Sequence, residues 1–452
     1  MYDPETDTYE LEDDKPLVLL IGGVGHEGVL SSLRAAGRQY KNKLLESKAT
    51  NWESIVSYFD AFPVEGVLVK LSPYAITLAC YSEYDGIREK LFDKIASVPN
   101  ILFVYEDVLS GNYKEDDDWE DYHHKPTHEE RERFFEFIAD YDIKLMPYKR
   151  NAEVTVMAQT FLADTEHNLL FRIYIPSSRL WFNETGKLLQ LFRDYLAKVS
   201  GLSVRLDQIR TDKGVIYEIH SDSADQSADI DFEFSGFTQF LDLCVADLDA
   251  AEKVLRSKSI TEKDIMPILS RYSKEAKRLS LDLKHERENK ILSIRQRLES
   301  ELIDNMPGAT DWNSIGQLVD ITVPQLSGTR SAIAIDQNSS GVTGIGSTHS
   351  LTINLKPQVV ENVNGIIAQE ITGNQTIELE AKKLLELIQS YGGKDATELA
   401  SSVHELEDTS APKEGRLNAK QRLKRFLISV SSKGGDVATG VLQSYIEKQL
   451  GL

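Results

Sequence analysis

The sequence predicts a multidomain chain with a small parallel α/β domain, an α+β domain, a long helix and a C-terminal module that is β-rich and then helical. Short apolar strands alternate with helical stretches in the first 112 residues, whereas strand pairs followed by helices occupy residues 141–258. A polar helical repeat fills residues 259–306. A stretch rich in Ser, Gly and Asn at 307–370 then precedes helical periodicity at 371–452.

Length, charge and cysteine content narrow the class of protein. A chain of 452 residues with a formal charge of −21 is too long for one ordinary core, and its field disfavours nonspecific attraction to nucleic acid or anionic membrane. Its two cysteines, Cys80 and Cys244, are too few for a disulfide framework or a zinc cluster. The first 14 residues lack the order of a signal peptide, and no uncharged run approaches the ~20 residues of a membrane span. We therefore expect a cytoplasmic protein without a transmembrane segment.

The first domain is expected at residues 16–112, after a disordered acidic tail at 1–15. Its apolar strands are predicted at 17–21, 67–69 and 101–105, with helices between them, and near-continuous apolar strands are typical of a parallel sheet covered on both faces. The dense acidic run at 115–121 cannot be buried, so we assign residues 113–140 to an acidic linker and helix.

The second domain, residues 141–258, is predicted to be α+β. Residues 202–209 and 215–219 form the plainest hairpin of the sequence, because two alternating runs flank a turn that contains Gly214. The other expected elements are strands at 154–161 and 169–175 and helices at 179–199 and 237–255.

A long basic helix is predicted at residues 259–306, which end just before Pro307-Gly308. Its apolar or small residues alternate four and three apart, as in a coiled-coil seam: Ile265, Leu269, Tyr272, Ala276, Leu279 and Leu283. The stripe must be buried, either against a second copy or against the chain's own α+β domain. We favour self-pairing and hence a homo-oligomer. The helix lacks the interleaved aromatics of a single-strand binder, so we expect protein partners and no nucleic-acid partner.

The clearest motif is Gly23-Val24-Gly25-His26-Glu27-Gly28, which has the G-x-G-x-x-G spacing between a strand and a helix. It resembles the dinucleotide-binding fingerprint, in which glycines permit a tight turn and close approach of a pyrophosphate to a helix N-terminus. Two features depart from it. Residues 38–46 do not read as a second strand ending in an acidic residue, and Glu27 places a carboxylate where the anion would lie. A nucleotide site and a glycine turn without a ligand both remain open.

Two carboxylates, Glu106 and Asp107, follow the strand at 101–105. Carboxyl ends of parallel strands meet at one edge, so we expect these side chains to share a crevice with the glycine turn. The candidate nucleotide-binding residues are therefore Gly22, Gly23, Gly25, Gly28, Glu106 and Asp107. No base or metal partner can be placed beside the carboxylates. We assign no catalytic residue and lean against an enzyme; the cofactor is unknown, with a nucleotide as the one candidate.

Three histidines, His123, His124 and His128, lie close together in the sequence. Pro126 interrupts any helix that would bring His124 and His128 onto one face, and further ligands are missing. We predict a hydrophilic linker and no metal site.

The C-terminal third combines a Ser/Gly/Asn-rich stretch at 341–354 with helices and a last amphipathic pair at 423–430 and 437–446. In this composition and order of elements it resembles the tails of bacterial abortive-infection proteins of the AbiTii type and related anti-phage conflict proteins. The resemblance covers roughly a quarter of the chain and implies a role in defence against phage, with the tail as an association module; it implies no catalytic residues.

Two functions follow as hypotheses. The first is an intracellular interaction or regulatory protein that self-associates and belongs to a bacterial anti-phage system. The alternative is a nucleotide-binding sensor or nucleotide-processing effector that uses the N-terminal α/β domain.

Overall fold

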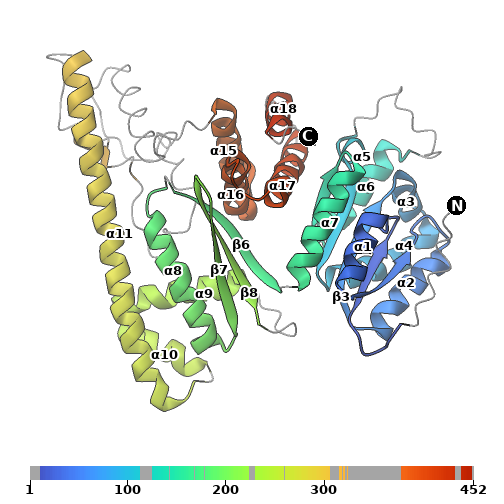
Figure 1. The fold of residues 1–452 in the computed structure, drawn as a ribbon, viewed down its shortest axis with the longest axis horizontal. Coiled ribbons are helices and arrows are strands. Elements are labelled where there is room, and N and C mark those ends of the chain that lie inside the picture. The colour runs from blue at the N-terminus through green and yellow to red at the C-terminus, as the bar shows by residue number, and fades with distance from the viewer. Residues whose placement is uncertain are drawn as a thin grey trace. The chain divides into compact units, whose positions relative to one another are not determined.

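The structure is a computed structural model of the whole chain (Figure 1). It describes residues 11–111, 125–141, 143–166, 168–177, 179–222, 230–258, 260–305, 315–317, 319–320, 323, 378–432 and 439–449. Residues 1–10 of the predicted acidic tail, the acidic run at 115–121 and most of the Ser/Gly/Asn-rich stretch lie outside these residues. Within them, no helix is both long enough and apolar enough to cross a membrane.

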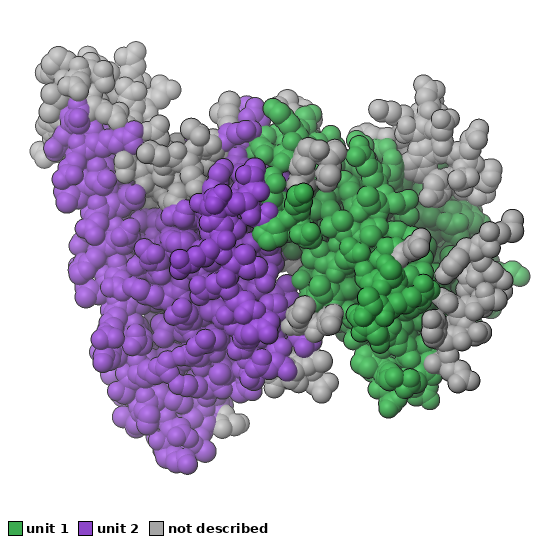
Figure 2. Space-filling model, in the orientation of Figure 1, with its two compact units in different colours: residues 1–167, 412–452 green, residues 168–411 purple. Residues whose placement is uncertain are grey.

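Two compact units make up the chain, coloured separately in Figure 2. The first contains residues 1–167 together with 412–452, and the second contains residues 168–411. These limits differ from the predicted boundaries. The α/β domain continues well past residue 112, and the C-terminal helices are divided between the two units.

The first unit contains a five-stranded parallel sheet in the order β2-β1-β3-β4-β5, which confirms the predicted parallel α/β domain (Figure 1). Its strands are β1 Leu17–Ile21, β2 Gln39–Lys43, β3 Val64–Leu71, β4 Asn100–Tyr105 and β5 Leu145–Tyr148. We predicted no strand at β2 because its sequence is polar, and that was wrong. A polar strand is stable there because it lies at the edge of the sheet, where it pairs with the whole of β1 and its residues are only half-buried.

Helices cover both faces of this sheet. Val18 and Leu20 pack with helices α1 (Glu27–Ala35) and α7 (Asn151–Glu166), whereas Leu17, Leu19 and Ile21 point to the opposite core. The opposite face carries α2 Ala49–Ala61, α3 Pro73–Ala79, the 3-10 turn η1 Ser82–Tyr84, α4 Asp85–Ala96 and α6 His128–Ala139. The short helix α5 (Glu106–Ser110) follows β4 directly.

Helix α7 replaces the strand that we predicted at 154–161. Its buried residues Val154, Met157, Ala158 and Phe161 recur three and four apart, which is the period of a helix and not of a strand. The β-branched residues of this segment favoured a strand, but contact with the sheet and with α1 decides the outcome.

The second unit contains a three-stranded antiparallel sheet in the order β6-β8-β7, and its β7–β8 hairpin confirms the prediction. The strands are β6 Leu169–Pro176, β7 Val204–Arg210 and β8 Gly214–Ser221. The helices are α8 Phe182–Tyr195, which continues as the π-turn η2 Leu196–Ser200, then α9 Ile230–Ala246 and α10 Leu248–Ser257.

The long helix is present as α11 (Glu262–Asn305), and all six residues of its stripe are buried within the second unit. They share one apolar cluster with Phe237, Phe240 and Leu255 of α9 and α10. The stripe therefore packs on the chain's own α+β domain, and self-pairing through this seam is wrong. Whether the chain self-associates through another surface stays a prediction.

Four C-terminal helices follow, as predicted, but they do not form one module. They are α15 Leu379–Tyr391, α16 Ala396–Glu407, α17 Lys413–Ser432 and α18 Thr439–Lys448, with a short 3-10 turn, η5 Gly393–Asp395, before α16. Helices α15 and α16 belong to the second unit, whereas α17 and α18 belong to the first. The periodicity of each helix is local, but the surface that each one covers depends on side chains far away in the sequence.

Helix α16 closes one edge of the antiparallel sheet. The Ser401 hydroxyl accepts a hydrogen bond from the Tyr174 N–H at 2.9 Å and donates one to the Tyr174 carbonyl at 3.2 Å. One side chain thus satisfies both backbone groups of Tyr174 at this edge of β6.

Candidate functional site

The carboxyl edge of the parallel sheet is where a functional site is most readily built in this fold. The strand order reverses between β1 and β3, and in open parallel sheets the loops at such a reversal form the ligand crevice. The described segments at this edge are the turn that starts at Gly22, Ser72 after β3, Glu106 after β4 and Lys149 after β5.

The turn after β1 begins with two glycines in the left-handed backbone region, Gly22 at φ +76° and Gly23 at φ +78°. A Cβ atom added at Gly22 would lie 2.1 Å from the backbone oxygen of Lys70 on β3. Gly22 is therefore required by the close approach of two strands. At Gly23 a Cβ atom would meet nothing within 4 Å, so only the backbone conformation favours glycine there.

The other two glycines of the motif lie against side chains of the same unit. A Cβ atom at Gly25 would be 2.8 Å from Asn42 Nδ2, and one at Gly28 would be 2.6 Å from Thr155 Cγ2 on α7. Packing inside the domain thus accounts for the missing side chains at Gly22, Gly25 and Gly28 without a ligand. The motif spacing predicted a crowded turn correctly, but it does not by itself identify what causes the crowding.

Two half-buried basic side chains lie beside this turn, on the α1 and α7 side of the sheet. Lys70 Nζ donates to Asn151 Oδ1 at 2.9 Å and lies 5.4 Å from the centre of the Tyr148 ring. Burial lowers the pKa of Lys70. His26 Nε2 lies 2.8 Å from Thr155 Oγ1. Burial, and then the charge of Lys70, lower the pKa of His26.

A third basic side chain, Lys43, lies at the end of β2. It donates to Ser54 Oγ at 3.1 Å, and burial, followed by the nearby Lys41, lowers its pKa. Among the described side chains, no carboxylate forms an ion pair with Lys43 or Lys70. Lys43 lies on the α2 face of the sheet, where it also contacts the Tyr58 ring, whereas Lys70 and His26 lie on the α1 and α7 face. The basic side chains therefore flank the end of β1 from opposite faces, and each could attract an anionic group.

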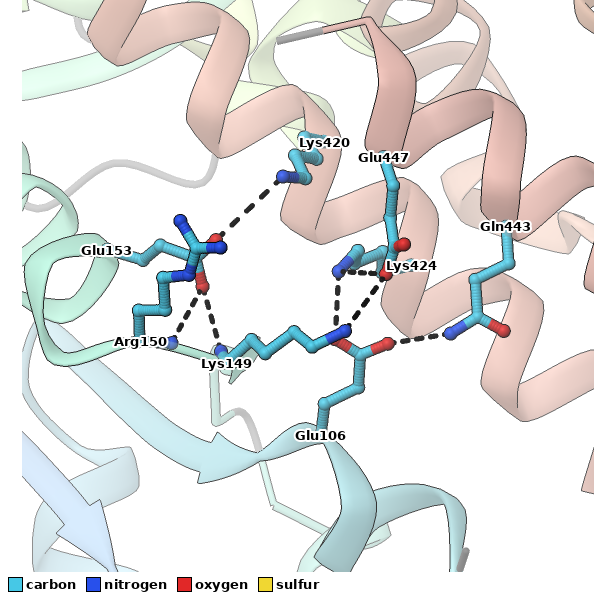
Figure 3. A network of polar contacts seen from close by, with 8 residues as sticks. All are labelled: Glu106, Lys149, Arg150, Glu153, Lys420, Lys424, Gln443 and Glu447. Carbon is cyan, nitrogen blue, oxygen red and sulfur yellow. Dashed lines mark hydrogen bonds and ion pairs between the residues drawn. The ribbon is translucent and has the colours of Figure 1, made fainter. Parts of the chain in front are cut away.

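Glu106 belongs to a different set of contacts at the same edge, drawn in Figure 3. Its carboxylate is buried; Oε2 accepts from Lys424 Nζ at 2.8 Å and Oε1 accepts from Gln443 Nε2 at 2.6 Å. Lys424 comes from α17 and Gln443 from α18. Asp107 lies beside Glu106 in the first turn of α5, where its carbonyl accepts from the Gly111 N–H. The C-terminal helices, and not the glycine turn, are the partners of the Glu106 carboxylate.

A second acidic side chain, Glu153 at the start of α7, extends this network (Figure 3). Its Oε2 accepts from the N–H groups of Lys149 and Arg150 at 2.8 and 3.3 Å, and its Oε1 lies 3.8 Å from Lys420 Nζ of α17. Burial, and then the charge of Lys424, lower the pKa of Lys420.

The last turn of α18 contributes a third acidic side chain, Glu447. Its Oε1 lies 3.3 Å from Lys424 Nζ and 3.7 Å from Lys149 Nζ. Burial would raise the pKa of Glu447, but Lys424 and Lys149 together lower it. Lysines and glutamates thus alternate across the contact, so that each buried charge has an opposite charge nearby.

The contact between α17 and the rest of the first unit includes buried polar side chains, Lys420, Gln421 and Lys424, on a hairpin that also buries apolar side chains such as Leu423, Phe426 and Ile446. Of the described residues of α17 and α18, only Leu417 belongs to the apolar clusters that cover the sheet. Gln421, one turn further along, is fully buried, and neither atom of its side-chain amide has a hydrogen-bond partner among the described residues. A buried amide of this kind is costly unless it finds hydrogen-bond partners.

Sequence reasoning missed the partners of Glu106 because they lie more than three hundred positions away from it in the chain. One local signal was available. Leu417, Lys420, Gln421 and Lys424 recur three and four apart, so polar residues share a helix face with a buried leucine. A face of this composition favours contact with a polar surface.

Of the three histidines that lie close together in the sequence, only His128 is among the described residues. His128 Nε2 pairs with Glu132 at 3.1 Å on the exposed side of α6, whereas His123 and His124 lie outside the described residues. Among the residues with described positions, no group of three or more His, Cys, Asp or Glu side chains could hold a metal ion.

Comparisons of the chain with models of protein families, with curated proteins and with solved structures find no match. The two groups of side chains at the carboxyl edge of the parallel sheet are therefore the features that bear on function.

Proposed function

We propose that the chain is an intracellular regulatory interaction protein whose α/β domain binds the C-terminal hairpin, defined as helices α17 and α18. The contact of Glu106 with Lys424 and Gln443 carries this proposal. Both carboxylate oxygens are engaged by side chains of the hairpin, at the edge where parallel sheets of this kind bind ligands. In this arrangement Glu106 acts as a binding residue.

The energetics of a buried ion pair support specific recognition. Two charges that leave water lose hydration free energy. Their mutual attraction offsets this loss only when the geometry is good, so the net stabilisation is small. Removal of one partner, however, leaves the other charge buried and unpaired. The Glu106–Lys424 pair therefore favours one docked arrangement of the hairpin over others.

The first test replaces Lys424 with methionine, which keeps the length of the side chain and removes its charge. Glu106 and Glu447 then lose a cation, and we expect amide hydrogens of residues 413–432 to exchange about a hundredfold faster. Hydrogen–deuterium exchange with mass spectrometry measures this change in the full-length protein.

Lys413→Met is the matched control, because Lys413 belongs to the same helix and is exposed. It should leave the exchange rates of the hairpin within about twofold of the unmodified protein. Equal exchange in the two variants would mean that the Glu106 contact does not hold the hairpin, and the proposal would be wrong.

The wider role that we propose is in bacterial defence against phage. It rests on the resemblance of the C-terminal third to AbiTii-type and related conflict proteins. The same pair of variants tests it. A phage panel should plate less efficiently on bacteria that express the unmodified chain or Lys413→Met than on bacteria that express Lys424→Met. Unchanged plating for every phage would count against this role.

A second function, nucleotide sensing, is favoured by one observation. Lys70 of β3 lies next to the end of β1 on the α1 and α7 face, without an ion pair to a carboxylate among the described side chains, and a Cβ atom at Gly23 would meet nothing within 4 Å. A phosphate group would supply the missing negative charge. The candidate residues are those of the turn, and Glu106 and Asp107 are not needed in this version of the site.

Thermal unfolding of the full-length protein against a panel of nucleotides tests this alternative. A ligand at one hundred times its dissociation constant should stabilise the first unit by about 2.7 kcal/mol. Lys70→Ala should abolish the shift, whereas Lys90→Ala, on the exposed side of α4, should preserve it. A panel without any shift would remove nucleotide sensing.

A further inference from the structure

We propose that the C-terminal hairpin is exchanged between two copies of the chain, so that Lys424 and Gln443 of one copy bind Glu106 of the other. This inference rests on the proposed function, because it uses the same contact. It names the partner as a second copy of the chain and gives self-association a route that does not need the stripe of α11.

The order of the chain permits the exchange. The polypeptide leaves the first unit at residue 167, forms the whole second unit and returns only at residue 412. The hairpin is therefore a separate segment that completes a distant domain. Its contacts with that domain are the same whether the domain belongs to its own chain or to a second copy, so the exchange requires a change only in the connecting segment.

The connecting segment between α16 and α17 is short. Asp408 accepts a hydrogen bond from the Tyr174 hydroxyl at 2.7 Å, which anchors the end of α16 to the second unit. Pro412 precedes the first residue of α17, and a proline has a nearly fixed φ angle. A short connection of this kind does not fold back easily, and short connections favour exchange of the element that follows them.

Part of the contact between the hairpin and the sheet consists of charged side chains. Lys424, Lys420 and Glu447 can be hydrated when they leave their partners, and Leu417 is the one apolar side chain that joins the cluster beneath the described part of the sheet. The unpaired amide of Gln421 gains hydrogen bonds to water on release.

Two charge-reversed variants of the full-length protein test the exchange. Glu106→Lys alone places two lysines together, and Lys424→Glu alone places two glutamates together, so each variant by itself should release its hairpin and remain a monomer. In an equimolar mixture, Lys424 of the first variant can bind Glu106 of the second, and the two substituted side chains can form the reversed ion pair. We expect native mass spectrometry to show a mixed dimer of doubled mass, with the slow amide exchange of the hairpin restored.

The double variant Glu106→Lys with Lys424→Glu separates the two proposals. Restored hairpin protection in the double variant, without a dimer in the mixture, would overturn the exchange and leave the proposed contact intact. If neither the double variant nor the mixture restores protection, the contact itself is wrong and the proposed function fails with it. A mixed dimer supports both.

A measurement on the unmodified protein covers the case in which charge reversal prevents folding. Lys149 of the α/β domain and Glu447 of the hairpin are 3.7 Å apart and partly exposed, so a carbodiimide can join them by an amide bond with loss of water. The protein is prepared in light and heavy nitrogen, mixed and held at high concentration before coupling. Joined peptides that combine a light Lys149 with a heavy Glu447 support exchange; joined peptides of one isotope alone would overturn it.

Discussion

Replacing Arg172 with methionine is expected to destabilise the second unit by about 3–5 kcal/mol, because it leaves the buried Glu405 carboxylate without its cation. The guanidinium contacts both oxygens of Glu405, at 2.8 and 2.6 Å, and the Glu405 side chain is only 2% exposed. We expect β6 and α16 to lose amide protection together. Urea unfolding followed by hydrogen exchange of residues 169–176 and 396–407 measures the effect.

Two variants distinguish burial from loss of charge. Arg256 also pairs with carboxylates, but its side chain is 48% exposed, so Arg256→Met should cost far less stability than Arg172→Met. The double variant Arg172→Met with Glu405→Gln removes both charges and should recover much of the lost stability. A similar loss in Arg172→Met and Arg256→Met would show that the Arg172 pair has no special role.

Replacing Gly22 with alanine is expected to destabilise the first unit by about 2–5 kcal/mol. The left-handed backbone costs a non-glycine residue about 1–2 kcal/mol, and overpacking in a fixed interior costs about 1–3 kcal/mol more. The added Cβ atom would lie 2.1 Å from the Lys70 oxygen, so β1 and β3 would have to separate. Thermal unfolding, with hydrogen exchange of residues 17–21 and 64–71, measures the loss.

Gly23 is the matched control, since its φ angle is almost the same and a Cβ atom there meets nothing within 4 Å. Gly23→Ala should therefore cost only the backbone term of about 1–2 kcal/mol. Equal effects at the two positions would contradict the conclusion that strand approach requires Gly22. Because neither variant needs a ligand, the result is independent of the nucleotide alternative.

The sequence was informative where local pattern and burial agree. Residues 17–21 and 101–105 are continuous apolar runs, and both lie in central strands buried on both faces. The β7–β8 hairpin follows from alternation around a glycine turn. The stripe of α11 predicted correctly that this face of the helix is buried. In each case the property that favours the element is contained within its own residues.

The sequence was misleading where a neighbour decides the structure. The polar segment of β2 forms a strand because β1 offers it hydrogen bonds along its whole length. The segment of α7 contains β-branched residues but forms a helix, because the three-and-four spacing of its buried residues fits the face of the sheet. The stripe of α11 has the composition of a coiled-coil seam, but the aromatic side chains of α9 cover it within the same chain. Apolar surface indicates that a face is buried without identifying its partner.

The candidate site shows the same division between sequence and tertiary structure. From the sequence alone, the glycine turn and Glu106 could be placed at one edge of a parallel sheet, because the carboxyl ends of parallel strands always meet there. Tertiary structure decided their partners: β3 and α7 for the glycines, and Lys424 and Gln443 for Glu106. A buried carboxylate needs a cation or a donor, but that group can come from anywhere in the chain. Hydrogen-bonding need is a local property of a residue, whereas the residue that satisfies it is set by the fold.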